Sequence, residues 1–458
     1  MEVCGDKEDA GPGKAAPQKN GPCHKCGTAR SFTSSRTRLF CRACYAEAVL
    51  HQFKKTLQVV KPARQQAGQL APILVAFSGG PASSALLACF EQVLRQDARK
   101  VQFAVHGVWV DCLDVLPLSP AEAAAIRARM AERMAACPFR SFRRVPLCAA
   151  FAPATLEPDE RGPSMQQLQR VFAGSRRPEV TWKEDLLDVL VRALLLRCAQ
   201  LTGGGCARLA TGETMTRCCI RLLAGMARGI GANAALTVAG VDPVTFGHLN
   251  VVLVRPLVGL TAREVALYLR AVGSAPLPTI PTFSTMACDK RSSLSLLSES
   301  FLLTLQNAHD HTLPTLIKSA QKIEPPAAGL MYSREWGNCM GCDAELRKTI
   351  AAQQSEPAKS ARCAVCLLVP PREAHRSDGC CGDGGGSGCD CSGGETAPPL
   401  CRVCALLVEE MQLANGATAR DVVVSVQDQM RARIAACSST RFTGARTASG
   451  RPMISCAV

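Results

Sequence analysis

Short, mostly apolar runs alternate along the chain with longer stretches in which apolar residues recur at helical spacing. Four such runs are predicted strands, and the first of them, which is unbroken, has the composition of a strand buried on both faces of a parallel sheet. They are residues 73–77, 101–111, 207–210 and 251–254. Amphipathic helices are predicted at residues 45–57, 121–136, 183–200, 293–306 and 314–323, and others begin at Pro81 and Thr261. Strands that alternate with helices predict an α/β fold with a parallel sheet.

The first apolar run leads through a small-residue turn into a helix that has Pro81 in its first turn, a position that favours proline. At such a junction, glycines let the backbone approach an anion, and the free amides at the helix start favour bound phosphate. The pattern fits an ordinary strand-turn-helix or a phosphate-binding loop. In the second case the nucleotide-binding residues are Ser78, Gly79, Gly80 and Ser83.

Two further candidate nucleotide contacts follow later strands. In parallel α/β sheets, ligands bind at the carboxyl ends of the strands. Asp111 ends the run at 101–111 and is a candidate for contacting a ribose or a base; an ordinary turn residue at a strand end is the alternative. Gly212 follows the run at 207–210 and is grouped with the same candidate site.

Two Cys-x-x-Cys pairs near the N-terminus are separated by 14 residues. Two thiolate pairs at this distance suit a tetrahedral Zn²⁺, because each pair can hold one edge of the tetrahedron. The predicted ligands of this zinc ribbon are Cys23, Cys26, Cys41 and Cys44. A redox-active dithiol is the alternative interpretation.

Three more Cys-x-x-Cys pairs lie beyond residue 335, around a Gly- and Ser-rich loop at 375–399. They compete for one further four-thiolate zinc site. The favoured ligands are Cys339, Cys342, Cys401 and Cys404, with Cys363 and Cys366 as the alternative first pair. With 26 cysteines and no signal peptide or membrane span in the pattern, the sequence favours metal thiolates in a reducing compartment, the cytoplasm.

The formal charge of +15 falls to +11 if eight cysteines bind two Zn²⁺ ions. This basic balance is consistent with a polyanionic partner such as nucleic acid, and a scattered solvated surface is the alternative. Arg217, Arg221 and Arg228 share one face of a predicted helix. They are the candidate RNA-binding residues, again with a solvated face as the alternative.

The segment from Ser78 to Ser83 resembles the PP-loop, Ser-Gly-Gly-x-Asp-Ser, of ATP pyrophosphatases, with Ala82 at the aspartate position. The order of this loop, the cysteine pairs, Thr211-Gly-Glu-Thr-Met-Thr-Arg217 and Val254-Arg-Pro256 extends the likeness. Over roughly residues 20–410, the chain resembles the cytoplasmic tRNA 2-thiolation protein 2 family.

That resemblance implies a subunit of the cytosolic complex that thiolates the wobble uridine of tRNA. The chain would form a heterodimer with a catalytic PP-loop thiolase, which takes sulfur from a thiocarboxylated ubiquitin-related modifier, and would contribute to attaching that modifier to proteins. The implied fold is an adenine-nucleotide α-hydrolase-like domain between two zinc modules. The expected divisions are a disordered start at 1–21, a zinc ribbon and helix at 22–58, the α/β domain at 70–335, a Cys-rich module at 336–410 and a tail at 411–458.

The sequence departs from the catalytic relatives of that family in two ways. Ala82 removes a carboxylate that could help to hold Mg²⁺, so use of ATP and Mg²⁺ by this chain alone is not expected. Between residues 72 and 335 no Cys-x-x-Cys is present to carry sulfur or a cluster, and no catalytic residue is assigned. The alternatives are a self-sufficient PP-loop ATP pyrophosphatase and a zinc-ribbon interaction scaffold.

Overall fold

The computed structural model describes most of residues 21–323. The gaps are 36–37, 61–69, 96–102, 152–164, 166–167, 170–171, 173–179, 204–206, 230, 232–233, 243–250, 275–279, 287–292 and 310. The expected disordered start up to residue 20 and the whole chain after residue 323 lie outside the described residues. Among the predicted sites this concerns Cys339, Cys342, Cys363, Cys366, Cys401 and Cys404.

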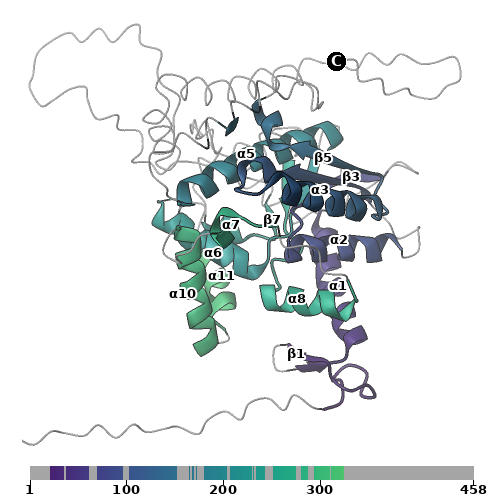
Figure 1. Ribbon diagram of the computed structural model, residues 1–458. Coiled ribbons are helices and arrows are strands. Elements are labelled where there is room, and N and C mark those ends of the chain that lie inside the picture. The colour runs from purple at the N-terminus through teal and green to yellow at the C-terminus, as the bar shows by residue number, and fades with distance from the viewer. Residues whose placement is uncertain are drawn as a thin grey trace, which may run out of the picture.

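A six-stranded sheet lies at the centre of the described part of the chain (Figure 1). In spatial order its strands are β5 (Ser141–Pro146), β4 (Phe103–Asp111), β3 (Ala71–Phe77), β6 (Ala207–Ala210), β8 (Val251–Val254) and β7 (Val241–Asp242). The first five are parallel to one another, and β7 pairs antiparallel with β8. The predicted parallel sheet is therefore confirmed, with one antiparallel strand added at its edge.

The predicted helices within the described residues are present, with ends that differ by a few residues. The helices are α1 (Arg42–Val59), α2 (Pro81–Leu94), α3 (Pro120–Ala135), α5 (Val180–Gly203), α6 (Met215–Ala227), α7 (Ala234–Val238), α8 (Ala262–Ala271), α9 (Phe283–Met286), α10 (Leu294–Ala308) and α11 (Thr312–Gln321). The helix predicted to begin at Thr261 is α8, and a capping box starts it. The Thr261 hydroxyl accepts from the Glu264 amide at 3.2 Å, and the Glu264 carboxylate accepts from the Thr261 amide at 2.9 Å.

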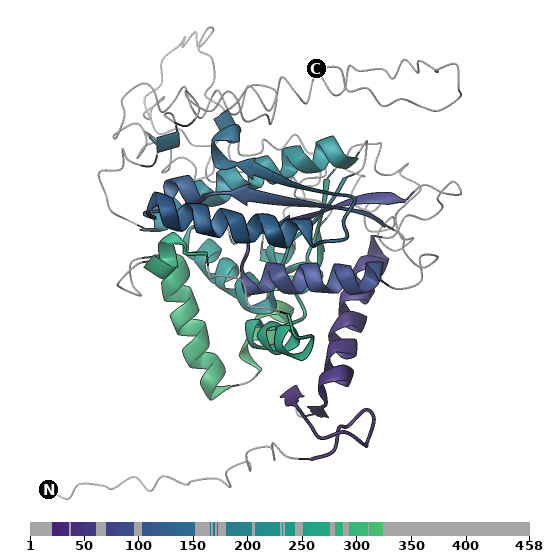
Figure 2. The same cartoon turned by 45° about the vertical axis from the view of Figure 1, so that its right-hand side comes forward.

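Helices cover both faces of the sheet (Figure 2). Because successive side chains of a strand point to opposite faces, the apolar run of β3 supplies two cores. Ile73, Val75 and Phe77 pack in one core with α1, α2 and α8, whereas Leu74 packs in the other with α5. A third cluster joins α6, α7, α10 and α11. The unbroken apolar runs thus have a simple cause, since both sides of each strand are buried.

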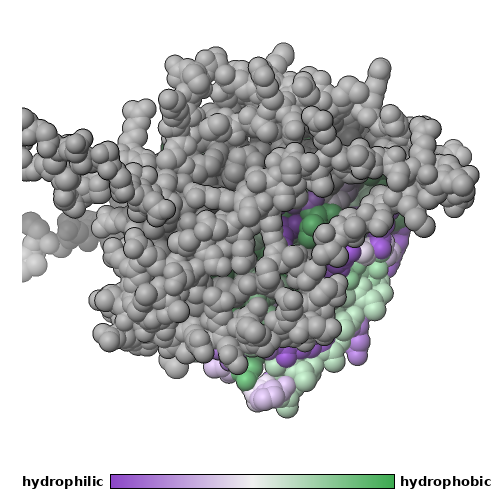
Figure 3. Space-filling view, turned by 90° about the horizontal axis from the view of Figure 1, so that it is seen from above, coloured by the Kyte–Doolittle hydropathy of each residue, from purple (hydrophilic) through white to green (hydrophobic). Residues whose placement is uncertain are grey.

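No helix in the described ranges has the length and apolar character that crossing a membrane requires. In the view of Figure 3, hydrophilic and apolar residues are interspersed wherever the described surface is visible.

Helix α1 is part of the core that covers one face of the sheet. The side chain of Phe53 is fully buried and meets the ring of Phe90 edge-on, with 5.0 Å between the ring centroids. Leu50 and Leu57 belong to the same cluster. The N-terminal module therefore shares a core with the α/β part, although the expected boundary between residues 58 and 70 stays a prediction.

Two polar contacts fix the direction of α1. Near its start, the hydroxyl of Tyr45 donates to the backbone carbonyl of Glu264 at 2.9 Å. Just past its end, the buried guanidinium of Arg208 on β6 donates to the carbonyl of Val60 at 2.8 Å. A cation at this end also suits the helix dipole. The helix is therefore held to the body at both ends.

Replacing Phe53 by Ala should lower the free energy of unfolding by about 3–5 kcal/mol, because it removes a fully buried ring and leaves a cavity. Urea denaturation of the full chain would measure this change. As a control, His51→Ala on the exposed side of α1 should change the stability by less than about 0.5 kcal/mol. Equal stabilities of the two variants would contradict the packing described for α1.

Candidate functional site

The predicted nucleotide-binding residues gather where the chain reverses its direction across the sheet. From β3 the chain adds β4 and β5 on one side, and it then returns to place β6 and β8 on the other side. β3 and β6 are therefore neighbours, and the loops that follow them flank the point where open α/β sheets bind ligands. The loop after β3 contains residues 78–80, and the loop after β6 contains residues 211–214.

The backbone of the loop after β3 has the shape of a phosphate loop. Gly79 has φ +79°, a left-handed conformation that favours glycine, and Gly80 is the N-cap of α2. The first amides of a helix have no partner within it. A Cβ on Gly212 would lie 2.9 Å from the backbone nitrogen of Ser83, so the two loops touch at a place where only glycine fits. The structure thus brings Ser78, Gly79, Gly80, Ser83 and Gly212 together.

The serine hydroxyls of this loop bind the loop itself. The hydroxyl of Ser83 accepts from the amide of Ser78 at 3.3 Å and donates to the carbonyl of Gly80 at 3.0 Å. The hydroxyl of Ser84 donates to the same carbonyl at 2.9 Å. These bonds hold the turn in shape, so binding of an anion here would rest mainly on backbone amides.

Asp111 lies at the carboxyl end of β4 and is fully buried. Its carboxylate accepts from Arg127 Nε at 2.7 Å, from Arg144 Nη2 at 2.5 Å and from the amide of Leu113 at 3.0 Å. Contact with a nucleotide stays a prediction, but the carboxylate is already engaged by two arginines. This pairing could not be predicted from the sequence, because Arg127 lies on α3 and Arg144 on β5.

Arg217 and Arg221 of α6 and Arg228 at its C-cap do not form one exposed stripe, which corrects the expectation drawn from helical spacing. Arg217 is exposed. Arg221 and Arg228 are partly buried, and each lies 3.0 Å from an acidic residue of α5, Asp188 and Asp185 respectively. A second helix therefore covers most of the face that was predicted to be free. RNA contact by these residues stays a prediction, and it fits Arg217 best.

Glu213, which sequence reasoning did not single out, is the centre of this charged network. Its carboxylate pairs with Arg221 and with Arg255 Nε, the latter at 2.5 Å. Burial raises the pKa of Glu213, but the charges of Arg221 and Arg255 outweigh this effect and lower its pKa to about 2. Glu213 is therefore ionised and ties the loop after β6 to α6 and to the end of β8. An acid three residues after a buried strand was the available signal.

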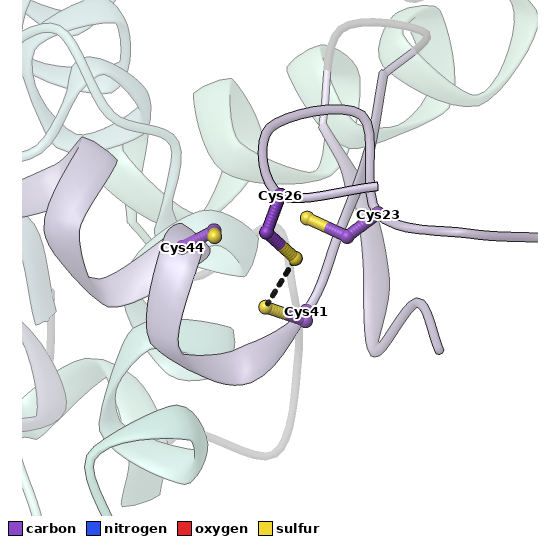
Figure 4. Close-up of side chains that lie close together, drawn as sticks. All are labelled: Cys23, Cys26, Cys41 and Cys44. Atoms are coloured by element: carbon purple, nitrogen blue, oxygen red, sulfur yellow. Dashed lines mark hydrogen bonds between the residues drawn. The ribbon is translucent and has the colours of Figure 1, made fainter. Parts of the chain in front are cut away.

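Four cysteine sulfurs converge at the N-terminal end of α1 (Figure 4). Cys23 and Cys26 precede the hairpin of β1 (Thr33–Ser35) and β2 (Arg38–Phe40), whereas Cys41 is the N-cap of α1 and Cys44 lies in its first turn. All four sulfurs lie within 4.8 Å of one another, and 4.0 Å separates those of Cys26 and Cys41. Sulfurs around a tetrahedral zinc are about 3.8 Å apart, given Zn–S bonds of about 2.3 Å. The predicted cluster is confirmed as a group that could hold a metal ion.

The charges of these thiols depend on one another. The amide of Ala29 is the main cause that lowers the pKa of Cys26 to about 6, and the hydrogen bond with Cys41 is the main cause that raises the pKa of Cys44 to about 12. Without a cation, one thiolate thus opposes ionisation of its neighbours. A bound divalent cation would remove that opposition and let all four act as thiolate ligands.

The fold and these sites define an α/β protein that has a PP-loop-like junction at the switch point of its sheet and a four-cysteine cluster at the N-terminal end of α1. No protein-family model matches the chain. Many curated proteins named Cytoplasmic tRNA 2-thiolation protein 2 do match it. The protein from Danio rerio is 26% identical over 468 residues, covering 86% of this chain and 89% of that protein. The protein 2-A from Xenopus laevis is 24% identical and covers 89% and 91%. The chain is a homologue of these proteins, which confirms the resemblance found in the sequence.

Among solved structures, the chain matches the U34-tRNA thiolase NcsA from Methanococcus maripaludis with its [4Fe-4S] cluster. The match has a TM-score of 0.47 and 14% identity, and it covers 66% of this chain and 86% of that chain. NAD⁺ synthetase from Burkholderia pseudomallei matches with a TM-score of 0.31 and 14% identity, covering 62% and 90%.

Replacing Glu213 by Gln should lower the free energy of unfolding at pH 7 by about 3 kcal/mol, because a buried charge partner is removed from two arginines. The effect should also depend on pH. Since the folded-state pKa is lowered to about 2, the carboxylate stabilises the fold above about pH 4.5, and this contribution is lost as the pH falls toward 2. Urea denaturation at several pH values would measure both effects.

The matched control is Glu132→Gln on α3, where the side chain is exposed and the expected change is below about 0.5 kcal/mol. If Glu213→Gln and the control had the same stability from pH 7 down to pH 3, Glu213 would not hold the loop as described.

Proposed function

We propose that this chain is a subunit, with little or no catalysis of its own, of a cytoplasmic complex that 2-thiolates the wobble uridine of tRNA. The observation that carries the proposal is the match, over most of both chains, to curated proteins named for cytoplasmic tRNA 2-thiolation. The proposed partners are a catalytic PP-loop thiolase in a heterodimer, the tRNA, and a thiocarboxylated ubiquitin-related modifier that supplies sulfur.

The phosphate loop supports a subunit that binds rather than reacts. The strand order around the switch point favours the adenine-nucleotide α-hydrolase-like fold. The conformation of Gly79 and the start of α2 keep backbone amides available for phosphate. Ala82 offers no carboxylate for Mg²⁺. ATP could therefore be held by residues 78–83 and Gly212 without being cleaved efficiently.

The cysteines around the sheet also argue for a catalytic partner. A sulfur carrier or cluster ligand must become a thiolate, and burial opposes this by raising the thiol pKa. Burial raises the pKa to about 12 for Cys89, Cys112, Cys137, Cys218 and Cys219, and to about 11 for Cys198. Within the described ranges, only the N-terminal cluster brings three or more metal-ligating groups together. Sulfur handling is therefore assigned to the partner.

The proposed metal in the N-terminal cluster is a structural Zn²⁺. Four sulfurs converge on one point at nearly the separations of a tetrahedron, and an all-thiolate tetrahedral set is typical of structural zinc. The ribbon has only two three-residue strands and a small cluster of buried cysteines, so a metal would supply much of its stability.

Replacing Cys26 by Ser should remove about one equivalent of zinc per chain and make the segment before α1 sensitive to protease, because the tetrahedral set loses a ligand. Elemental analysis and limited proteolysis of the purified chain would measure this. The control is Cys137→Ser. Cys137 lies outside the cluster, so this variant should keep the zinc content of the wild type. Unchanged zinc content in the Cys26 variant would rule out the ribbon site.

The isolated chain should not thiolate tRNA and should cleave little ATP, and thiolation should appear when a PP-loop protein with an intact Ser-Gly-Gly-x-Asp-Ser is added. Retardation of thiolated tRNA in a mercury-containing gel would measure the product. Ala82→Asp should not create thiolation in the isolated chain, because the sulfur-handling cysteines would still be missing.

Robust thiolation by this chain alone would contradict the subunit proposal and favour a self-sufficient ATP pyrophosphatase. If the catalytic protein thiolated tRNA equally well with and without this chain, the subunit proposal would also be contradicted. The chain would then be an interaction scaffold.

A further inference from the structure

Positive charge is concentrated in the N-terminal module, defined here as residues 21–60, which contains the cysteine cluster and α1. The module has seven Lys and Arg residues but only one acidic residue, whereas the whole chain has 53 against 38. Its formal charge is +6, or +4 when four thiolates and one divalent cation add −2. The module is therefore far more basic than the rest of the chain.

Several of these charges face the solvent. Lys25, Arg38, Arg42 and Lys55 are exposed. Lys25 pairs with Glu47 at 2.7 Å, and both side chains of that pair are largely exposed, so solvent screens it. Arg42 lies 5.2 Å above the ring of Phe32, a contact that leaves its charge in place. Within the described residues, no acidic side chain pairs with Arg38, Arg42 or Lys55.

Several arginines around the sheet are in a different situation. Arg127 pairs with Asp111, Arg221 pairs with Glu213, and Arg255 pairs with the same glutamate. Their charges are therefore balanced inside the fold, and they are poorly placed to neutralise an external polyanion.

The cysteine cluster joins two turns that each carry an exposed cation. Lys25 lies inside the first Cys-x-x-Cys turn, and Arg42 lies inside the second. The ribbon projects from the end of α1 that lies far from the sheet, as both views show (Figures 1 and 2). Because α1 is fixed at Tyr45 and Val60, the module is a firmly held cationic arm.

The surface of the module suits a polyanion better than a protein partner. Protein interfaces are anchored by exposed aromatic and large apolar side chains. The large exposed apolar residues of the described chain are Leu201, Met226, Met286, Leu297, Phe301, Leu303 and Ile323, and all lie outside the module. Cations without apolar anchors are typical of contacts to a phosphate backbone.

We propose that the N-terminal module binds the phosphate backbone of RNA, and that the cysteine cluster positions its cations for this contact. The inference deepens the proposed function, since it assigns a grip on tRNA to a surface other than α6. Each phosphate that is neutralised releases counterions, so the contact should weaken as salt is added. With so few aromatic residues, the contact should depend little on base sequence.

The test replaces four exposed cations of the module together in the full-length chain. The variant is Lys25→Gln, Arg38→Gln, Arg42→Gln and Lys55→Gln. The matched control removes the same charge from α8, α11 and the residue after α11. It is Arg263→Gln, Arg270→Gln, Lys318→Gln and Lys322→Gln, all exposed. Fluorescence anisotropy with labelled tRNA, at 50–200 mM salt and with and without the catalytic partner, gives the affinity and its salt dependence.

The module variant should lose about tenfold or more in tRNA affinity at ~100 mM salt and should show a shallower salt dependence, whereas the control should stay close to the wild type. Unchanged zinc content and urea midpoint would show that the variant is folded. Chelation of the metal should weaken tRNA binding by a similar factor, because Lys25 and Arg42 would no longer be held together.

If the module variant bound tRNA as tightly as the control and the wild type, this inference would be overturned. The proposed function would not be affected. If the module variant no longer bound the catalytic partner but kept its tRNA affinity, the inference would be overturned too. The module would then be a surface for protein contact. If the wild-type chain bound no tRNA, either alone or with the partner, the proposed function itself would fail.

Discussion

The close approach of Gly212 to the backbone of Ser83 is the contact on which the centre of the sheet depends. A side chain at residue 212 would overlap the first turn of α2, so the loops after β3 and β6 can meet only through glycine. The next residue, Glu213, is held by Arg221 and Arg255, which fixes the loop from its other side. One steric contact and one ionic network therefore set the geometry of the switch point together.

The loop after β3 can keep a phosphate-binding shape without a carboxylate at position 82. Backbone amides are positioned by the left-handed turn at Gly79 and by the start of α2, and neither depends on the residue at position 82. A metal-orienting carboxylate depends on that one side chain, which is Ala82 here. Binding and turnover can thus separate through a single position, as the proposed division of labour requires.

Local patterns in the sequence predicted the parts of the fold that local physics determines. Residues 207–210 and 251–254 became β6 and β8 without a shift, and all four residues of each strand are buried. The spacing of the cysteine pairs likewise predicted the convergence of their sulfurs. By contrast, β5 carries exposed arginines at a sheet edge and β7 has two residues, so neither has a readable apolar pattern.

The arginines of α6 show where such prediction ends, and why the basic surface had to be sought elsewhere. Helical spacing placed Arg221 and Arg228 on one face, but it could not show that α5 covers this face with Asp188 and Asp185. In the N-terminal module the only acidic residue is Glu47, so its cations repel one another and need a device that gathers them. Four thiolates around a divalent cation carry a net −2, which offsets that repulsion while fixing both turns. A metal centre in this position would therefore act on the charge of the surface as well as on the fold of the ribbon.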